Sequence, residues 1–452
     1  MTDVKAILNG LFGTDEDDDD DSNDDNDSKE EASAVEGSSN QNASQSTHIK
    51  NGLSLGGGRG IFTNNKNVKA GTLLLAETPT MTWDGLDLNE KGGLSLAIRK
   101  VLSDNVIYES CKSLHPFDLT SYTPEDIDLI ISEVIGGNEI IESIIQEYSV
   151  ELNDVVRLAL VLQFNSLKSG LYLNVSMFNH SCEPNCIVFT PSSSSNWMAE
   201  VWATKDIASN EECFICYAPA TSTLILPQEQ SFASISSYLL DQHKFVCACR
   251  KCINEKDVTD VNSDFEAELL ELERQVLLSK LHSPLDLMKI SKSVIKWVDS
   301  QHDINEIAIQ LKSRATKVAV SAAATTLELL QNEQCDKNIH AKLKYFAFNF
   351  LIQSLLLVKY QIQYLGEYHP DLARTYLDIA ESMTGLIQND IDFFLVSIKN
   401  STKNSDLSHL SLSELKEKAR YYRKESIKIQ TLYNRRKNYP QSLNNKLSLY
   451  WG

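Results

Sequence analysis

The sequence predicts an α+β protein in which a β-rich region contains a block of helices and is followed by an all-helical region. Three observations predict this organisation. Short runs of β-forming residues flank residues 95–166, the apolar residues within 95–166 recur at helical spacing, and every apolar pattern after Cys252 has helical spacing. The length of 452 residues corresponds to two or three domains.

The β-rich region begins with glycines and β-formers in residues 56–81, which indicate a glycine-rich loop followed by short strands. We expect strands at 72–75, 186–189, 199–203 and 212–217. Within the helical block, residues such as Val155, Leu158, Ala159 and Leu162 share one helix face. The block therefore predicts a helical insert, at about 81–166.

The C-terminal half is predicted to consist of helical hairpins. Helices are expected around Phe265–Val276 and at 345–365, 370–383 and 415–433. Pro370 suits a first helical turn, and the small side chains of Ala373 and Ala380 allow close helix packing, as in tetratricopeptide-like pairs. The alternative is an ordinary helical domain without a peptide groove.

Acidic residues outnumber basic ones, because 62 Asp and Glu stand against 42 Lys and Arg, a formal net charge of −20. This balance excludes a nucleic-acid binder that works through a basic surface. Residues 15–31 alone hold twelve acids and one lysine. We predict that residues 1–50 form a disordered acidic tail, since they contain too little apolar surface to offset the entropy of ordering. The tail either aids solubility or docks on a basic partner.

No targeting or membrane segment is expected. The first residues have only a short apolar stretch before the acids, whereas a secretory signal needs a longer one. The most apolar window, residues 346–364, contains several Asn, Gln, Ser and Lys side chains and is interpreted as a core helix. Nine cysteines without a signal favour a reducing compartment, so we expect the protein in the cytoplasm, the nucleus or both.

Four cysteines have a spacing typical of a metal site. Cys247, Cys249 and Cys252 form a CxCxxC cluster, and Cys182 precedes it by 65 residues beside a proline-containing turn. Four thiolates suit a tetrahedral structural zinc ion, with buried reduced thiols as the alternative. Cys213 and Cys216 lie in an expected strand, where residues three apart point to opposite faces, so we exclude them as a chelating pair.

Several motifs occur in an order that identifies a family. They are Gly58-Arg59-Gly60-Ile61-Phe62, Gly170-Leu171-Tyr172, Asn179-His180-Ser181-Cys182-Glu183-Pro184-Asn185-Cys186, Glu211-Glu212, Ile215-Cys216-Tyr217 and the CxCxxC cluster. The chain resembles SET-domain protein lysine methyltransferases of the SMYD type over about residues 51–254. The resemblance implies a SET domain with the helical insert, a zinc-binding post-SET segment at about 243–254, and a tetratricopeptide-like domain at 255–452.

The family's fold implies a pseudoknot, in which a C-terminal segment threads under a preceding loop and brings Asn179 and His180 beside Tyr217. S-adenosylmethionine would bind on one side, and the substrate lysine would enter a channel from the other. Matching the family's motifs gives the expected cofactor contacts, which are Gly58, Arg59, Gly60, Asn165, Asn179, His180 and Phe245.

Tyr217 matches the family's catalytic tyrosine, whose hydroxyl orients the lysine amine. Methyl transfer needs a neutral amine, although a free lysine has a pKa of about 10.4. A positive sulfonium and a dry aromatic channel both favour the neutral form, so we expect no dedicated general base. The resemblance implies a protein-lysine N-methyltransferase with a histone or non-histone protein substrate and a peptide partner on the helical domain. The alternative is a catalytically silent SET scaffold that binds partners through its helices.

Three departures from the family pattern bear on this reading. The family's cysteine- and histidine-rich MYND finger is missing, because residues 81–157 contain only Cys111 and His115 of these types. His243 replaces a tyrosine of the channel wall, which leaves the number of methyl groups added open. Asn210 replaces a glycine, a change that its tolerance of left-handed turns makes minor.

Overall fold

The architecture comes from a computed structural model, which describes the following residues: 49–54, 58–83, 88, 92–167, 169–190, 198–218, 232–256, 271, 274, 286, 289, 292, 293, 296, 300, 306–332, 337–401 and 405–433. It divides into two compact units. One comprises Leu75–Met177 and Thr190–Glu200, and the other comprises His48–Leu74, Phe178–Phe189 and Val201–Gly452. The predicted acidic tail lies outside the described residues except for its last two. Its boundary at residue 50 is wrong, because the first strand already begins at Ile49.

The first unit contains the helical insert. Its helices are α2 (Gly93–Leu102), α3 (Asn105–Cys111), α4 (Pro124–Leu129), a π-helical segment (Ile130–Ile135), α5 (Asn138–Tyr148) and α6 (Leu152–Asn165). Local sequence explains their starts, since Asp104 accepts hydrogen bonds from two amides of α3 and Thr123 forms a capping box with Asp126. The predicted helical insert is therefore observed, followed by the short strands β5 (Ser166–Leu167) and β6 (Gly170–Leu171), which form a sheet with β4 (Met81–Thr82).

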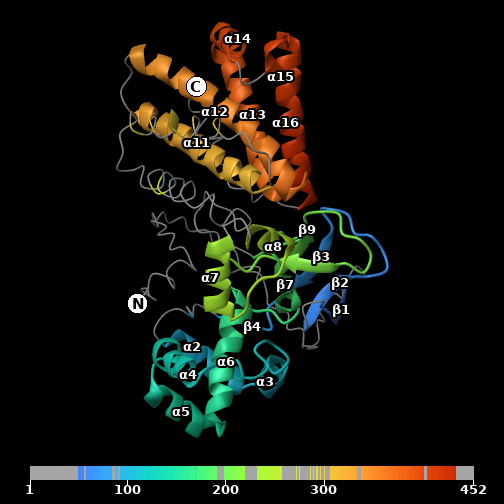
Figure 1. Ribbon diagram of the computed structural model, residues 1–452, viewed down its shortest axis with the longest axis vertical. Coiled ribbons are helices and arrows are strands. Elements are labelled where there is room, and N and C mark those ends of the chain that lie inside the picture. The colour runs from blue at the N-terminus through green and yellow to red at the C-terminus, as the bar shows by residue number, and fades with distance from the viewer. Residues whose placement is uncertain are drawn as a thin grey trace, which may run out of the picture. The chain divides into compact units, whose positions relative to one another are not determined.

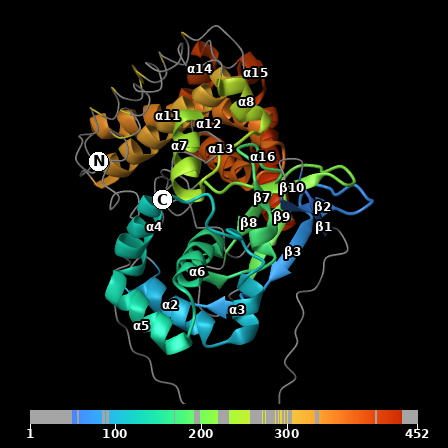
Figure 2. The same ribbon diagram turned by 60° about the horizontal axis from the view of Figure 1, so that its bottom comes forward.

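Helix α6 is the centre of this unit. The sequence predicted one buried face, but every residue from Val155 to Leu162 is buried. The reason is that α2, α5 and the π-helical segment all pack on α6, as Figure 2 shows for the two helices. A helix that is covered on several sides is apolar around its circumference, which an amphipathic pattern does not predict.

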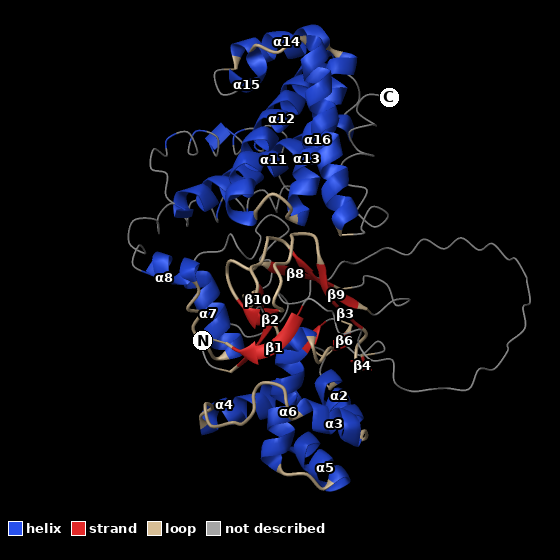
Figure 3. Ribbon diagram, turned by 90° about the vertical axis from the view of Figure 1, so that its right-hand side faces the viewer, coloured by secondary structure: helices blue, strands red, loops and turns tan. Residues whose placement is uncertain are grey.

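The second unit contains the sheet that carries the site. Its strands are β1 (Ile49–Leu53), β2 (Arg59–Thr63), β10 (Glu212–Ile215) and β7 (Asn179–His180), in the order β1-β2-β10-β7. Figure 3 labels the first three of them. β10 pairs antiparallel with β2 and parallel with β7, where Ile215 lies opposite His180. Apart from these two units as divided, the chain also forms a three-stranded sheet in the order β3 (Leu73–Glu77), β9 (Ala199–Ala203), β8 (Cys186–Phe189).

The expected strand at 212–217 is two residues too long. β10 ends at Ile215, and the backbone N–H of Tyr217 donates to the side chain of His180 instead of to a neighbouring strand. The strands expected at 186–189 and 199–203 are confirmed.

The remaining helices of this unit are α7 (Phe232–His243), α8 (Arg250–Lys256), α11 (Glu306–Asn332), α12 (Lys337–Leu365), α13 (Pro370–Asn389), α14 (Ile391–Asn400), α15 (Ser405–Ser408) and α16 (Leu412–Leu432). α11, α12, α13 and α16 pack in succession (Figure 1). Pro370 does begin a helix, and Ala373 and Ala380 are fully buried in its packing. The helix expected around Phe265 lies outside the described residues.

A shared core joins the helices of this unit to its strands. Tyr433, just after α16, packs edge-on against Trp202 of β9 and Phe189 of β8, with ring centroids 5.6 and 5.7 Å away. Its hydroxyl donates to the carbonyl of Tyr368 at 2.7 Å. In the part of the chain that the structure describes, no helix combines the length and apolar character needed to span a bilayer.

Candidate active site and metal centre

Tyr217 is held at both ends by the segment that contains β7. Its backbone N–H donates to Nδ1 of His180 at 2.9 Å, and its hydroxyl donates to the carbonyl of Phe178 at 2.6 Å. Desolvation raises the pKa of Tyr217 well above its ordinary value, against a smaller opposing effect of Arg59. The phenol therefore stays protonated at neutral pH and has a fixed direction.

Aromatic rings surround Tyr217. Its centroid lies 5.1 Å from that of His243 and 6.4 Å from that of Phe245, which stands perpendicular to it. The His180 ring lies 5.4 Å from Tyr217, and Tyr238 of α7 lies 5.9 Å from His243. The predicted residues Phe245 and His180 thus meet Tyr217, and His243 is its nearest ring neighbour among the described residues.

Asn179 has a defined orientation because both acceptors of its amide group are known. Its Nδ2 donates to the carbonyl of Arg59 at 2.6 Å and to Oε1 of Glu212 at 2.8 Å. Glu212 is 7% exposed, and its Oε2 accepts from the Ser54 hydroxyl at 2.9 Å. Oδ1 of Asn179 accepts no hydrogen bond from any residue that the structure describes, so it can accept one from a ligand.

Gly60 makes room for this arrangement. A Cβ atom at Gly60 would lie 2.4 Å from Oε1 of Glu212 and 3.0 Å from Nδ2 of Asn179. Any side chain would therefore displace the carboxylate that holds Asn179. The sequence did not single out Glu212 as a site residue, because its contact with Asn179 depends on the pairing of β2 with β10.

Arg59 and Gly58 flank Gly60. Arg59 is half-buried, and desolvation lowers the pKa of its guanidinium, an effect that Tyr217 opposes. Gly58 is exposed with φ of 83°, a conformation that favours glycine.

Asn165 belongs to the other unit and is described by itself. It ends α6, is 8% exposed, and its Nδ2 donates to the carbonyls of His115 at 2.6 Å and Val161 at 2.8 Å. Its predicted role as a cofactor contact stays a prediction.

Asn185 is a second residue that sequence reasoning missed. Its Nδ2 donates to the carbonyl of Glu212 at 2.9 Å, and its Oδ1 accepts from the N–H of Phe214 at 2.8 Å. The side chain is buried and supplies a hydrogen-bond partner to two backbone groups of β10. The Asn-rich motif at 179–186 was the available signal.

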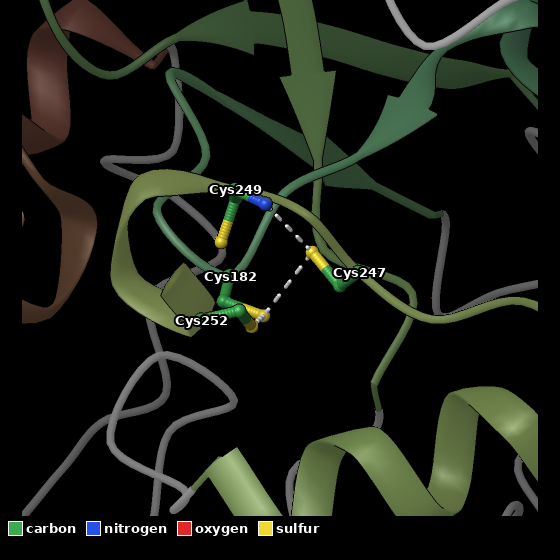
Figure 4. A group of neighbouring side chains, drawn as sticks. All are labelled: Cys182, Cys247, Cys249 and Cys252. Carbon is green, nitrogen blue, oxygen red and sulfur yellow. Dashed lines mark hydrogen bonds between the residues drawn. The ribbon is translucent and has the colours of Figure 1, made fainter. Parts of the chain in front are cut away.

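The four predicted metal ligands come together. Cys182 follows β7, Cys247 and Cys249 precede α8, and Cys252 lies in α8. Their Sγ atoms all lie within 4.8 Å of one another, and Figure 4 shows the four side chains gathered around a common centre. The Cys182 sulfur is 3.9 Å from that of Cys247 and 3.4 Å from that of Cys252. Four sulfurs bound tetrahedrally to zinc would stand about 3.8 Å apart, so this donor set fits the ion.

Hydrogen bonds within the cluster move the pKa values of the four thiols apart. A hydrogen bond with Cys182 lowers the pKa of Cys249 to about 6 and lowers that of Cys247, whereas bonds to neighbouring cysteines raise the pKa of Cys182 and Cys252.

The other cysteines that the structure describes do not join this cluster. Cys213 is fully buried in β10, whereas the thiol of Cys216 faces the carbonyl of Ala218 at 3.8 Å. Cys111 lies in the core of the insert, where burial raises its pKa to about 11. Among the described residues, Cys182, Cys247, Cys249 and Cys252 are the only group with metal-site geometry.

A comparison of the chain with protein families finds one match in the region that contains this sheet and Tyr217. The model of the SET domain matches residues 58–218. The matched range contains both the helical insert and Tyr217. The SET-domain resemblance drawn from the motifs is confirmed over these residues.

Named relatives share this region. The chain is 36% identical over 100 residues to "Protein-lysine N-trimethyltransferase SMYD5" of Gallus gallus, covering 22% of each protein. It is 35% identical over 96 residues to "N-lysine methyltransferase SMYD2" of Gallus gallus, covering 21% of this chain and 19% of the relative. It is 31% identical over 129 residues to "Histone-lysine N-methyltransferase SMYD3" of Homo sapiens, covering 28% and 25%. The matches thus span only a quarter or less of each of these relatives.

Proposed function

We propose that the protein is an S-adenosylmethionine-dependent protein-lysine N-methyltransferase. The observation that carries the proposal is the fixed hydroxyl of Tyr217, which lies in a SET domain beside His180 and among aromatic rings. The relatives that share this region are named as lysine methyltransferases, which supports the same reaction class.

Tyr217 orients the substrate amine. Because its hydroxyl hydrogen is used by the carbonyl of Phe178, the oxygen lone pairs remain to accept an N–H of the lysine. Its raised pKa excludes a phenolate acting as base at neutral pH. The aromatic rings of His243 and Phe245 disfavour a charged ammonium by excluding water, so the amine reacts in its neutral form.

The cofactor would supply an activated methyl group and a positive sulfonium. We assign its binding to the predicted contacts, with Oδ1 of Asn179 accepting from its ammonium group and Arg59 facing its carboxylate. Gly58 and Gly60 add no side chains of their own to the segment around Arg59, and Phe245 would pack against the ligand. The remaining predicted contacts are Asn165 and His180.

The finer fold follows from the same proposal. We propose that the segment ending in Tyr217 threads under the 178–186 loop as a pseudoknot, which the two Asn185 hydrogen bonds to β10 support. A structural zinc ion bound by Cys182, Cys247, Cys249 and Cys252 would fix the post-SET segment that carries Phe245. The succession of packed helices from α11 to α16 supports a tetratricopeptide-like domain.

The substrate class is a protein that bears an accessible lysine, histone or non-histone, with a peptide partner on the helical domain. The net charge of −20 favours approach of lysine-rich substrates. We propose a location in the cytoplasm, the nucleus or both.

A catalytically silent scaffold is the second candidate, because His243 stands in contact with Tyr217 where the family carries a tyrosine. An imidazole changes the polarity of the channel wall that the lysine must pass. The two candidates differ in one observable, the transfer of methyl groups.

The test is the Tyr217→Phe variant, with Tyr421→Phe as the control because Tyr421 is 52% exposed on α16. Purified protein is incubated with labelled S-adenosylmethionine and an array of lysine peptides. Tyr217→Phe should keep its cofactor affinity and lose methyl transfer at least about tenfold, the value of one positioning hydrogen bond. Equal rates in the two variants would contradict the role of Tyr217, and no transfer by the unaltered protein would favour the scaffold.

A further inference from the structure

The imidazole of His180 is hydrogen-bonded at both ring nitrogens. Nδ1 lies 2.9 Å from the backbone nitrogen of Tyr217, and Nε2 lies 3.2 Å from Sγ of Cys182. A backbone N–H can only donate, so Nδ1 carries no hydrogen and the ring proton of the neutral imidazole lies on Nε2. His180 therefore donates to the sulfur of Cys182 and accepts from Tyr217.

On the tyrosine side, His180 holds the backbone of a residue that lies just past the end of β10. β7 and β10 pair in parallel up to Ile215 and His180, and the N–H of Ser181 still donates to the carbonyl of Ile215 at 2.9 Å. Tyr217 lies beyond this ladder. Its N–H donates to the imidazole of His180, and its hydroxyl donates to the carbonyl of Phe178, which precedes His180 by two residues.

On the cysteine side, His180 contacts a member of the cluster. A zinc-bound thiolate is a pure acceptor, which matches the N–H that His180 presents to Cys182. Hydrogen bonds of this kind orient metal ligands, and their loss typically costs 10- to 100-fold in metal affinity.

We infer that His180 is a positioning residue whose side chain connects the cysteine cluster to Tyr217. Its two hydrogen bonds make the geometry of Cys182 and the backbone position of Tyr217 depend on one ring. This goes beyond the contact with cofactor expected of His180, and its effect on catalysis rests on the proposed function.

Two substitutions separate the two bonds. His180→Asn keeps a short amide whose oxygen can accept from the Tyr217 N–H but does not reach Cys182. His180→Gln has a longer amide whose N–H can reach Cys182 at the position of Nε2. His409→Asn is the matched control, because His409 is exposed in the helical domain.

The first readout is zinc affinity of the full-length protein, measured by competition with a chromogenic chelator. His180→Asn should bind zinc about 10- to 100-fold more weakly, and His180→Gln should stay within about threefold of the unaltered protein. The second readout is amide hydrogen exchange of Tyr217 in zinc-loaded protein labelled with ¹⁵N-tyrosine, whose signal is identified by its loss in Tyr217→Phe. In His180→Gln the Tyr217 amide hydrogen should exchange at least about tenfold faster than in the unaltered protein, and in His180→Asn it should remain protected.

A ring that only fills space would give the two variants the same profile in both readouts, and that result would overturn the proposal. Unchanged zinc affinity in His180→Asn would also overturn it. Both readouts are independent of methyl transfer, so they test the connection even if the protein proves to be a scaffold. If transfer is observed, His180→Gln should lower kcat with little change in the KM for S-adenosylmethionine.

Discussion

The substitution Gly60→Ala adds one methyl group to the proposed cofactor site. The new carbon would lie 2.4 Å from Oε1 of Glu212, about 1 Å closer than an ordinary contact. Gly60 lies within β2, so alanine itself fits the backbone. The Glu212 carboxylate is 7% exposed and also held by Ser54, so it must move away from Asn179.

The expected cost is the hydrogen bond from Asn179 to Glu212, which is 2.8 Å long. A bond to an ionised acceptor contributes about 1.5–3 kcal/mol. If cofactor binding requires the observed orientation of Asn179, the loss of this bond raises the Kd for the cofactor roughly 10- to 160-fold.

The assay is calorimetric titration of the zinc-loaded protein with S-adenosylhomocysteine, the proposed product. The control is Gly52→Ala, because Gly52 lies opposite Gly60 in β1 and the atoms nearest to a Cβ atom there belong to the ring of Phe62. It should change stability but not affinity. Adding Glu212→Asp to Gly60→Ala shortens the carboxylate and should recover part of the affinity. An unchanged Kd in Gly60→Ala, with the protein folded, would refute the reasoning.

Three further outcomes follow from the structure. Cys247→Ala should lose bound zinc while Cys213→Ala retains it, as measured by metal content per protein; equal contents would contradict the ligand assignment. Asn185→Ala leaves one buried and one partly buried backbone group of β10 unpaired and should cost about 2–4 kcal/mol in urea unfolding, so a change below about 0.5 kcal/mol would be contrary evidence. Burial raises the pKa of Asp378 to about 7 from its usual value near 4. Between these two pH values the folded state binds the proton and the unfolded state does not. The free energy of unfolding therefore falls as the pH rises through this range, by at most about 1.4 kcal/mol per pH unit. Asp378→Asn should therefore unfold at higher guanidinium than the unaltered protein at pH 8 and at the same concentration near pH 4; no gain at pH 8 would contradict this.

Residue spacing predicted what depends on local pattern. The CxCxxC cluster needs only one turn and a helix start to gather three sulfurs, and Cys182 follows directly on a short strand. Helices such as α13 were predictable because proline at the start and an apolar stripe are local signals. The choice of Tyr217 came from the family resemblance, since an isolated tyrosine at a strand end carries no distinctive pattern.

Contacts that depend on strand pairing were not predictable. Glu212 meets Asn179 only because β10 pairs with β2 on one side and β7 on the other. β10 ends two residues before the predicted end, and the N–H of Tyr217 donates to Nδ1 of His180 instead of to a strand. The β-propensity of residues 212–217 gives no information about such a contact. The all-round burial of α6 depends on helices that pack from separate parts of the insert.

The central claim is that this SET domain binds S-adenosylmethionine for methyl transfer. Calorimetric titration of the zinc-loaded, full-length protein with S-adenosylmethionine tests it without knowledge of the substrate. Saturable binding of one cofactor per chain, weakened in Gly60→Ala, is the predicted result. Absence of binding in protein that is folded and holds its zinc would contradict the claim and favour the scaffold.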